Sequence, residues 1–429
     1  MSDDAIRVGT KRYEGRDNAA LQKAVDDAAA AGGGMVELPA GVFDMHNALH
    51  VRSGVTVVGQ GEDTVLRKVP SVSSPIVDWL GYGHYEITVE RPGLFRVGMG
   101  VAVTDQRTGG FFTTTGTIVR IKGDALFIDK PFNADYHGSR EGHVVSVYPL
   151  VAGENVSNVA LRDVTLDGRG EPARMNGCRG AGVYLLMAHT ATLDGVTVRD
   201  YNGDSVSFQQ CTDVVVRDCH LHHNAGGGIH PGSGSVRYLL EGNVVHDNGG
   251  DGIFYCLRTT HSLCRGNTIC DNARNGISIG ERDTDHILRA NAIQGNGGAG
   301  ILFREVRHHG GDRVRVEANR LIGNCTDEGE AEVVIASRIR DVELLGNSFE
   351  SVKEHPLAVG EDVSGVRAGL NTLDGRPYDP DLPGVEPCEG AAGPLDVGPS
   401  AARPDSAWHL GVDLPAEPAN FRMDPPLPQ

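Results

Sequence analysis

Three short stretches with the same layout decide the fold: GGDGIFYC at 249–256, ARNGISIG at 273–280 and GGAGILFR at 297–304. They place Asp251, Asn275 and Ala299 at intervals of 24 residues. Steps of 23 or 24 residues extend the series back to Gly227, Asp204 and Ala181. Two residues beyond each position stands a β-branched residue, in the order Val183, Val206, Ile229, Ile253, Ile277 and Ile301. A fixed period of this length indicates a stack of structural repeats.

Further columns follow the same period. One is hydrophobic: Val198, Leu221, Val245, Ile269, Ile293, Leu321 and Phe349. Two are asparagines: Asn243, Asn267, Asn291, Asn319 and Asn347, and Asn224, Asn248, Asn272, Asn296 and Asn324. β-branched residues pack well on a pleated surface, and stacked asparagine amides can bond the next coil. Leucine-rich and helical repeats would need other patterns, which do not occur. We therefore predict an all-β fold, a right-handed parallel β-helix built as a single-stranded solenoid.

The rest of the chain departs from this period. Residues 17–31 predict a helix with Asp17 as its cap, which would close the N-terminal end of the solenoid. The stretch 82–150 has the alternation of antiparallel hairpins. The chain is rich in proline from Pro377 onward. We expect an N-terminal cap with the first coils at 1–81, a small antiparallel β insertion at 82–150, the main β-helix at 151–376 and a Pro-rich tail at 377–429.

Composition limits the partners. A formal net charge of −18 argues against nucleic acid, which prefers a basic surface. The chain has no apolar run near the roughly 20 residues of a membrane span, so no membrane partner is expected. No apolar stretch follows the start MSDDAIRVGTKRYEGRD, which predicts a cytoplasmic protein unless export uses another route. The eight cysteines lack CxxC pairs and are expected to be free thiols.

The segments NAALQKAVDDAAAAGGGMVELPAGVF (18–43) and VRSGVTVVGQGEDTVL (51–66) resemble the N-terminal signature of the pectate-lyase-like superfamily. That superfamily includes polysaccharide lyases, glycoside hydrolases, mannuronan epimerases and phage depolymerases. The resemblance implies a carbohydrate ligand along an outer face of the coils. Trimeric relatives also make a homo-oligomer, a trimer, an expectation.

Three coil segments resemble mannuronan C5-epimerase modules: LRDVTLDG (161–168), TDVVVRDCHLHHN (212–224) and VVHDNGGDGIF (244–254). The catalytic Tyr, Asp and His of that family would fall on Gly203, Val206 and Phe208 of this chain. Only Arg174 would stand where the family carries a catalytic Lys. The resemblance therefore implies the scaffold and the position of a cleft, but the catalytic motif is not retained.

Charged residues gather at one turn edge of the coils. Arg258 and Arg282 lie 24 residues apart, near Glu281, Arg304 and Glu305. Such a cluster is either a solvated rim or the wall of a groove. Neighbouring strands are about 4.8 Å apart, so these arginines could bind successive acidic sugar units. Together with Arg174 they are the candidate substrate-binding residues.

Other residues are candidates for catalysis. His230 or Tyr255 could act as a base in β-elimination or epimerisation, with Arg258 or Arg282 neutralising the sugar carboxylate. Asp204 and Asp251 are either Asx turns or acid/base groups. The leading hypothesis is an enzyme that acts on an acidic poly- or oligosaccharide by elimination or epimerisation. The alternatives are a glycoside hydrolase using Asp204, Asp251 or Glu281, and a non-catalytic carbohydrate-binding or assembly scaffold.

No cofactor or metal is expected from the sequence. The pairs His222–His223 and His308–His309 are adjacent residues, which rarely converge on one ion, and no ligand spacing suggests zinc. Clusters of Asp and Glu could hold Ca²⁺, but no spacing supports such a site.

Overall fold

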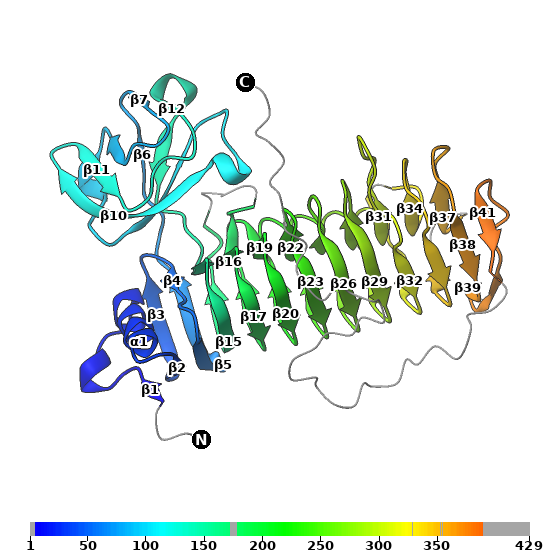
Figure 1. The fold of residues 1–429 in the computed structure, drawn as a ribbon, viewed down its shortest axis with the longest axis horizontal. Coiled ribbons are helices and arrows are strands. Elements are labelled where there is room, and N and C mark those ends of the chain that lie inside the picture. Colours follow the sequence, from blue (N-terminus) through cyan, green and yellow to red (C-terminus); the bar gives the residue numbers. More distant parts are fainter. Residues whose placement is uncertain (1–4, 172–177, 328, 352, 354, 389–429) are drawn as a thin grey trace. The chain divides into compact units, whose positions relative to one another are not determined.

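The computed structural model describes residues 5–171, 178–327, 329–351, 353 and 355–388. It is a parallel β-helix in which each regular coil contributes three short strands, and this confirms the predicted fold (Figure 1). Each strand pairs in parallel with its counterpart in the next coil, because a strand this short is stable only within a stack.

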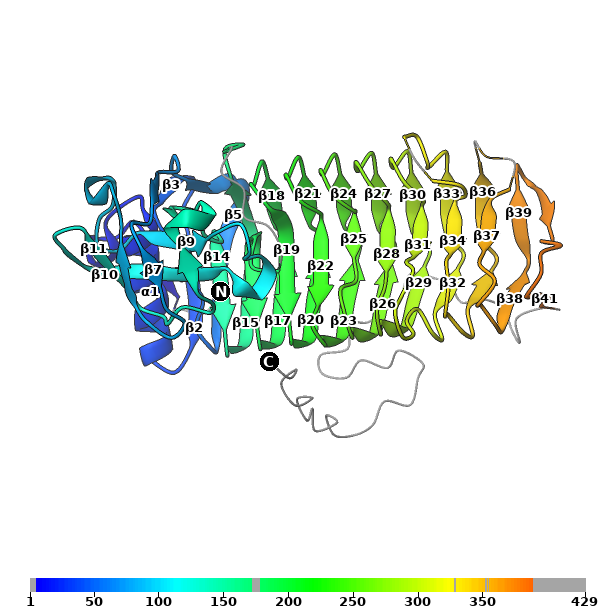
Figure 2. The ribbon, with the colours of Figure 1, turned by 90° about the horizontal axis from the view of Figure 1, so that it is seen from above.

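The first strands of the coils form a ten-stranded sheet, seen as a row in Figure 2. Its strands are β4 (Leu49–His50), β14 (Val151–Glu154), β16 (Ala181–Leu186), β19 (Asp204–Gln209), β22 (Ile229–Gly232), β25 (Ile253–Phe254), β28 (Ile277–Ile279), β31 (Ile301–Phe303), β34 (Val333–Ile335) and β37 (Leu357–Val359).

The second and third strands of the coils belong to one 23-stranded sheet. The second strands are β17 (His189–Asp194), β20 (Thr212–Arg217), β23 (Val236–Glu241), β26 (Thr260–Arg265), β29 (Thr284–Arg289), β32 (Arg315–Glu317), β35 (Glu343–Leu345) and β38 (Val366–Gly369). The third strands are β18 (Thr197–Arg199), β21 (His220–His222), β24 (Val244–His246), β27 (Thr268–Cys270), β30 (Ala292–Gln294), β33 (Arg320–Ile322), β36 (Ser348–Glu350) and β39 (Asn371–Leu373). The sheet also includes β1 (Ile6–Arg7), β2 (Gly34–Glu37), β3 (Gly41–Met45), β5 (Val55–Lys68), β15 (Ser157–Asp167), β40 (Arg376–Tyr378) and β41 (Val385–Pro387).

The predicted columns line the interior. Ile229, Ile253 and Ile277 pair with one another in register and are completely buried. The asparagines form two hydrogen-bonded ladders as expected. Asn267, for example, donates from Nδ2 to Asn291 Oδ1 at 2.8 Å and accepts from Asn243 Nδ2 at 2.9 Å. These bonds satisfy buried polar groups at each corner, so the ladders fix the register of the coils.

Helix α1 (Asn18–Ala30) closes the N-terminal end. The Asp17 carboxylate accepts hydrogen bonds from the backbone N–H groups of Ala19 and Ala20, both at 3.1 Å, as the sequence predicts for an N-cap. The apolar face of α1, which includes Leu21 and Val25, is buried against the first coils.

An antiparallel insertion interrupts the coils. Its six-stranded sheet runs in the order β6 (Ser73–Pro75), β13 (His143–Val145), β9 (Gly100–Thr104), β10 (Thr114–Lys122), β11 (Ala125–Ile128) and β8 (Glu86–Thr88). A small pair, β7 (Trp79–Leu80) and β12 (Tyr136–His137), lies beside it. The insertion has a hydrophobic core of its own, which includes Ile87, Val101 and Phe132. Most of the Pro-rich segment, from residue 389, lies outside the described residues.

Candidate functional site

The outward residues of the ten-stranded sheet carry the first group of interest. Ser207 of β19 pairs in register with His230 of β22, and Phe254 of β25 pairs with Ser278 of β28. His230 Nδ1 lies 2.7 Å from Asp204 Oδ2, while the other carboxylate oxygen of Asp204 accepts the backbone N–H of Gly227 at 2.7 Å. The coil period therefore brings two predicted catalytic residues into direct contact.

His230 is almost fully enclosed, with 6% of its surface exposed. Burial opposes the charged ring, but the hydrogen bond with Asp204 and the neighbouring Cys256 outweigh it and raise the pKa of His230 to about 10. Its Nε2 atom has no hydrogen-bond partner among the described residues. The ring is thus held as a cation at neutral pH, which disfavours His230 as a base and suits a proton donor.

An open pocket of about 610 Å³ lies further along the same sheet. Its lining includes Asp251, Phe254, Arg274, Asn275, Arg304 and Glu330. Phe254 joins this pocket to the Asp204–His230 pair, because its ring packs edge-on against His230 at 5.1 Å and beneath the Arg304 guanidinium at 4.2 Å. Arg304 is fixed by hydrogen bonds to Ser278 Oγ and to the Tyr255 carbonyl, both at 2.6 Å.

Asp251 is the carboxyl group of this pocket. Its Oδ1 atom accepts from the backbone N–H of Asn275 at 2.9 Å and from the Asn275 side chain at 2.7 Å. Burial nevertheless raises the pKa of Asp251, since only 7% of the residue is exposed. A carboxylate with a raised pKa takes up a proton more readily than an ordinary one, so Asp251 is suited to acid/base chemistry.

The turn-edge charges form a separate group. Glu281 Oε1 bonds His308 Nδ1, and its Oε2 accepts the backbone N–H of Arg307, both at 2.8 Å, so this carboxylate holds the 304–312 loop. Arg258 and Arg282 both have positive φ, at 66° and 57°, as turn residues. Glu305 is exposed. The pocket lining takes in Arg304 but none of these four residues.

Two other predicted site residues are not placed in the groove. Tyr255 is completely buried inside the solenoid, beside Tyr238 and His286, so its predicted role as a base is not supported by its position. Arg174 lies outside the described residues. Val206 and Phe208, which align with epimerase catalytic residues, also face the core.

Several residues of the site were not predicted from the sequence. Phe254, Asn275 and Glu330 line the pocket, and Cys256 contacts both His230 and Cys178. Hydrogen bonding to Cys178, together with burial, raises the pKa of Cys256 well above its usual value. The outward column identified Phe254, but the segment with Cys178 has no fixed register that the period could reveal.

Comparisons with known proteins agree with this architecture. The A-module of mannuronan C-5 epimerase AlgE6 from Azotobacter vinelandii superposes with a TM-score of 0.56 and 18% identity, covering 90% of this chain and 100% of that one. The Dettilon tailspike protein gives a TM-score of 0.56 at 13% identity over 86% of this chain and 62% of its own. The Agl-KA catalytic domain gives 0.52 at 13% identity over 86% and 58%. The chain belongs to the parallel β-helix superfamily.

A family described as "Periplasmic copper-binding protein (NosD)" matches residues 141–354 of this β-helix protein. A search of curated proteins finds no match. The predicted cytoplasmic location is wrong, because it conflicts with the periplasmic description of the matching family. The start of the printed chain misled that prediction. No helix among the described residues is long and apolar enough to cross a membrane.

Proposed function

We propose that this β-helix protein acts on an acidic poly- or oligosaccharide, by β-elimination or epimerisation, in the groove around Asp251, Phe254 and Arg304. One observation carries the proposal: a buried carboxyl group of raised pKa and fixed cations line the same open pocket. The fold shared with an epimerase module supports the scaffold only, so the chemistry is argued from the pocket.

The pocket offers contacts for one uronate unit. Arg304 and Arg274 can pair with the sugar carboxylate, and the exposed face of Phe254 can pack against the sugar ring. Arg304 is anchored to the strand below it, so it costs little ordering on binding. These contacts favour an acidic sugar over a neutral one.

The reaction assigns Asp251 as the proton acceptor. The C5 proton of a uronate passes to Asp251, and Arg304 stabilises the charge that develops on the carboxylate. In elimination, the C4–O4 bond then breaks with its electron pair leaving on O4, which takes a proton, and a C4=C5 double bond forms. In epimerisation, a proton returns to C5 from the opposite face. The protonated His230, on the far side of Phe254, is our candidate for either donor.

A glycoside hydrolase is the second candidate. Asp251 and Glu330 both line the pocket, and hydrolysis uses a pair of carboxyl groups. The alternative pair of the sequence hypothesis is less favourable, because Asp204 is held by His230 and Glu281 by the 304–312 loop.

The test incubates the full chain with polymannuronate and polygalacturonate. Ultraviolet absorbance of unsaturated uronate reports elimination, proton NMR reports epimerisation, and new reducing ends without absorbance report hydrolysis. We expect one of the first two signals, with Asp251→Asn lowering turnover at least ~100-fold and Arg304→Gln raising KM for the acidic substrate.

The control is the double variant Asp213→Asn with Arg237→Gln, which removes a carboxylate–arginine pair (Nε to Oδ1, 2.8 Å) from the 23-stranded sheet. It should leave turnover unchanged. Saturable binding without any product would identify the scaffold alternative instead. Equal turnover by the wild type and both pocket variants would place the site elsewhere.

A further inference from the structure

A cluster of four histidines and one aspartate lies away from the sugar groove, at the third strands of two adjacent coils. His222 of β21 pairs in register with His246 of β24, and their rings stack 5.1 Å apart with 2° between their planes. His223 and Asp247 follow these residues in the chain, and His220 precedes them on β21. The sequence showed only the adjacent pair His222–His223, whereas the coil period adds His246.

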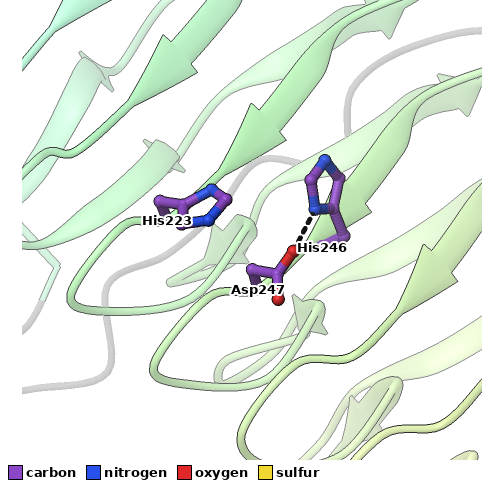
Figure 3. Close-up of side chains that lie close together, drawn as sticks. All are labelled: His223, His246 and Asp247. Atoms are coloured by element: carbon purple, nitrogen blue, oxygen red, sulfur yellow. Dashed lines mark hydrogen bonds and ion pairs between the residues drawn. The ribbon is translucent and has the colours of Figure 1, made fainter.

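Three of these side chains converge. One potential ligand atom from each of His223, His246 and Asp247 lies within 4.8 Å of the other two, and Figure 3 shows the three groups facing one another. His246 is partly buried, while His223 and Asp247 are exposed. Bonds of about 2.0–2.2 Å would need only a small closure of the exposed side chains.

The remaining histidines orient the rings that would bind. His246 Nδ1 lies 2.5 Å from Asp247 Oδ2, and His246 Nε2 lies 2.7 Å from His220 Nε2. His223 Nδ1 lies 2.7 Å from His222 Nδ1, which leaves the Nε2 atom of His223 for a ligand. Histidine ligands in proteins usually have their second nitrogen held by a hydrogen bond, and both rings here meet that condition.

We propose that His223, His246 and Asp247 form a binding site for a first-row transition-metal ion, with His220 and His222 as positioning residues. Two imidazoles and one carboxylate suit Cu²⁺, Zn²⁺, Ni²⁺ or Fe²⁺ rather than Ca²⁺, which prefers oxygen ligands throughout. Cu²⁺ binds most tightly to a given site of this kind. The three protein ligands leave further positions of the ion to water.

The proposal goes beyond the sugar chemistry and is independent of it. All five residues fall inside the range 141–354 that matches the family described as copper-binding, and their donor set fits that metal. A bound copper ion would supply a Lewis-acidic or redox centre at this edge of the coils. The role of the chain's own residues is to hold and orient it.

The experiment uses the full chain, free of any affinity tag and stripped with a chelator. Calorimetric titrations with CuCl₂ and with ZnCl₂ measure affinity and stoichiometry, and electron paramagnetic resonance of the copper form reports nitrogen ligands. We expect one ion per chain, tighter binding of Cu²⁺ than of Zn²⁺, and coupling to two nitrogens. His223→Gln and His246→Gln should each weaken binding at least tenfold, and the double variant should lose the spectrum.

The matched control is the double variant His308→Gln with His309→Gln, another exposed histidine pair on neighbouring chain positions. It should bind like the wild type. Circular dichroism of every variant checks that the coils are intact. Unchanged stoichiometry and spectrum in the His223/His246 double variant, or loss of binding in the control alone, would overturn the proposal.

Discussion

At the scale of the residue, the contact between His230 and Asp204 gives the molecule a pH-dependent term. The pKa of His230 is raised to about 10, above the value of about 6.5 for an unperturbed histidine. The protonated pair therefore stabilises the fold fully below the lower value, and this contribution is lost as the pH rises through the higher one. Asp204→Asn removes the partner, so its cost should be largest at low pH, about 3 kcal/mol.

Urea unfolding of the wild type and Asp204→Asn at about pH 6, 8 and 10 measures this term. We expect the difference in unfolding free energy to shrink steadily toward the highest pH. Asp213→Asn is the comparison, because Asp213 pairs with Arg237, which stays charged throughout. A cost for Asp204→Asn that is constant across the range would mean that His230 is neutral in the folded protein.

At the scale of the element, a glycine at the entry to each first strand lets the coil close. A Cβ atom on Gly252 would lie 2.4 Å from Ile269 Cγ2 and 2.7 Å from the Gly276 carbonyl oxygen. Gly228 and Gly276 are equally crowded by the next inward column. Gly252→Ala should therefore cost about 1–3 kcal/mol by forcing adjacent strands apart.

The melting temperature measures this cost against Gly93→Ala, where an added Cβ meets nothing within 4 Å. We expect a clear fall for Gly252→Ala and almost none for Gly93→Ala. Equal melting temperatures would show that the coils have room that the packing does not reveal.

The period explains what the sequence could predict. Identical positions stack, so the buried isoleucines and the asparagine ladders followed directly from spacing. Alternation after Ile253 also turns Tyr255 inward, and choosing that residue for its chemistry ignored the pattern. Contacts that join different strands of a coil, such as His220 with His246, or that involve an excursion, such as Cys178 with Cys256, carry no periodic signal.

At the scale of the whole molecule, the end of the solenoid needs a cover. Stacked parallel strands leave unpaired backbone groups and apolar side chains at the last coil, and such an end associates with other chains. In this protein α1 covers the first coils with a face on which Leu21 and Val25 are completely buried. The expected homotrimer is a separate question, since trimers can form along the sides of the coils, but sedimentation addresses both.

Leu21→Lys should detach the cover, because a lysine at a completely buried site without a partner carries a desolvation cost of several kcal/mol. We expect association that grows with protein concentration, seen in sedimentation velocity as species larger than the wild-type particle, whatever the oligomeric state of that particle is. Ala19→Lys places the same charge on the exposed side of the same helix and should sediment like the wild type. If Leu21→Lys also sediments unchanged and unfolds at the same urea concentration, then α1 does not protect the end, and the first coils must be stable uncovered.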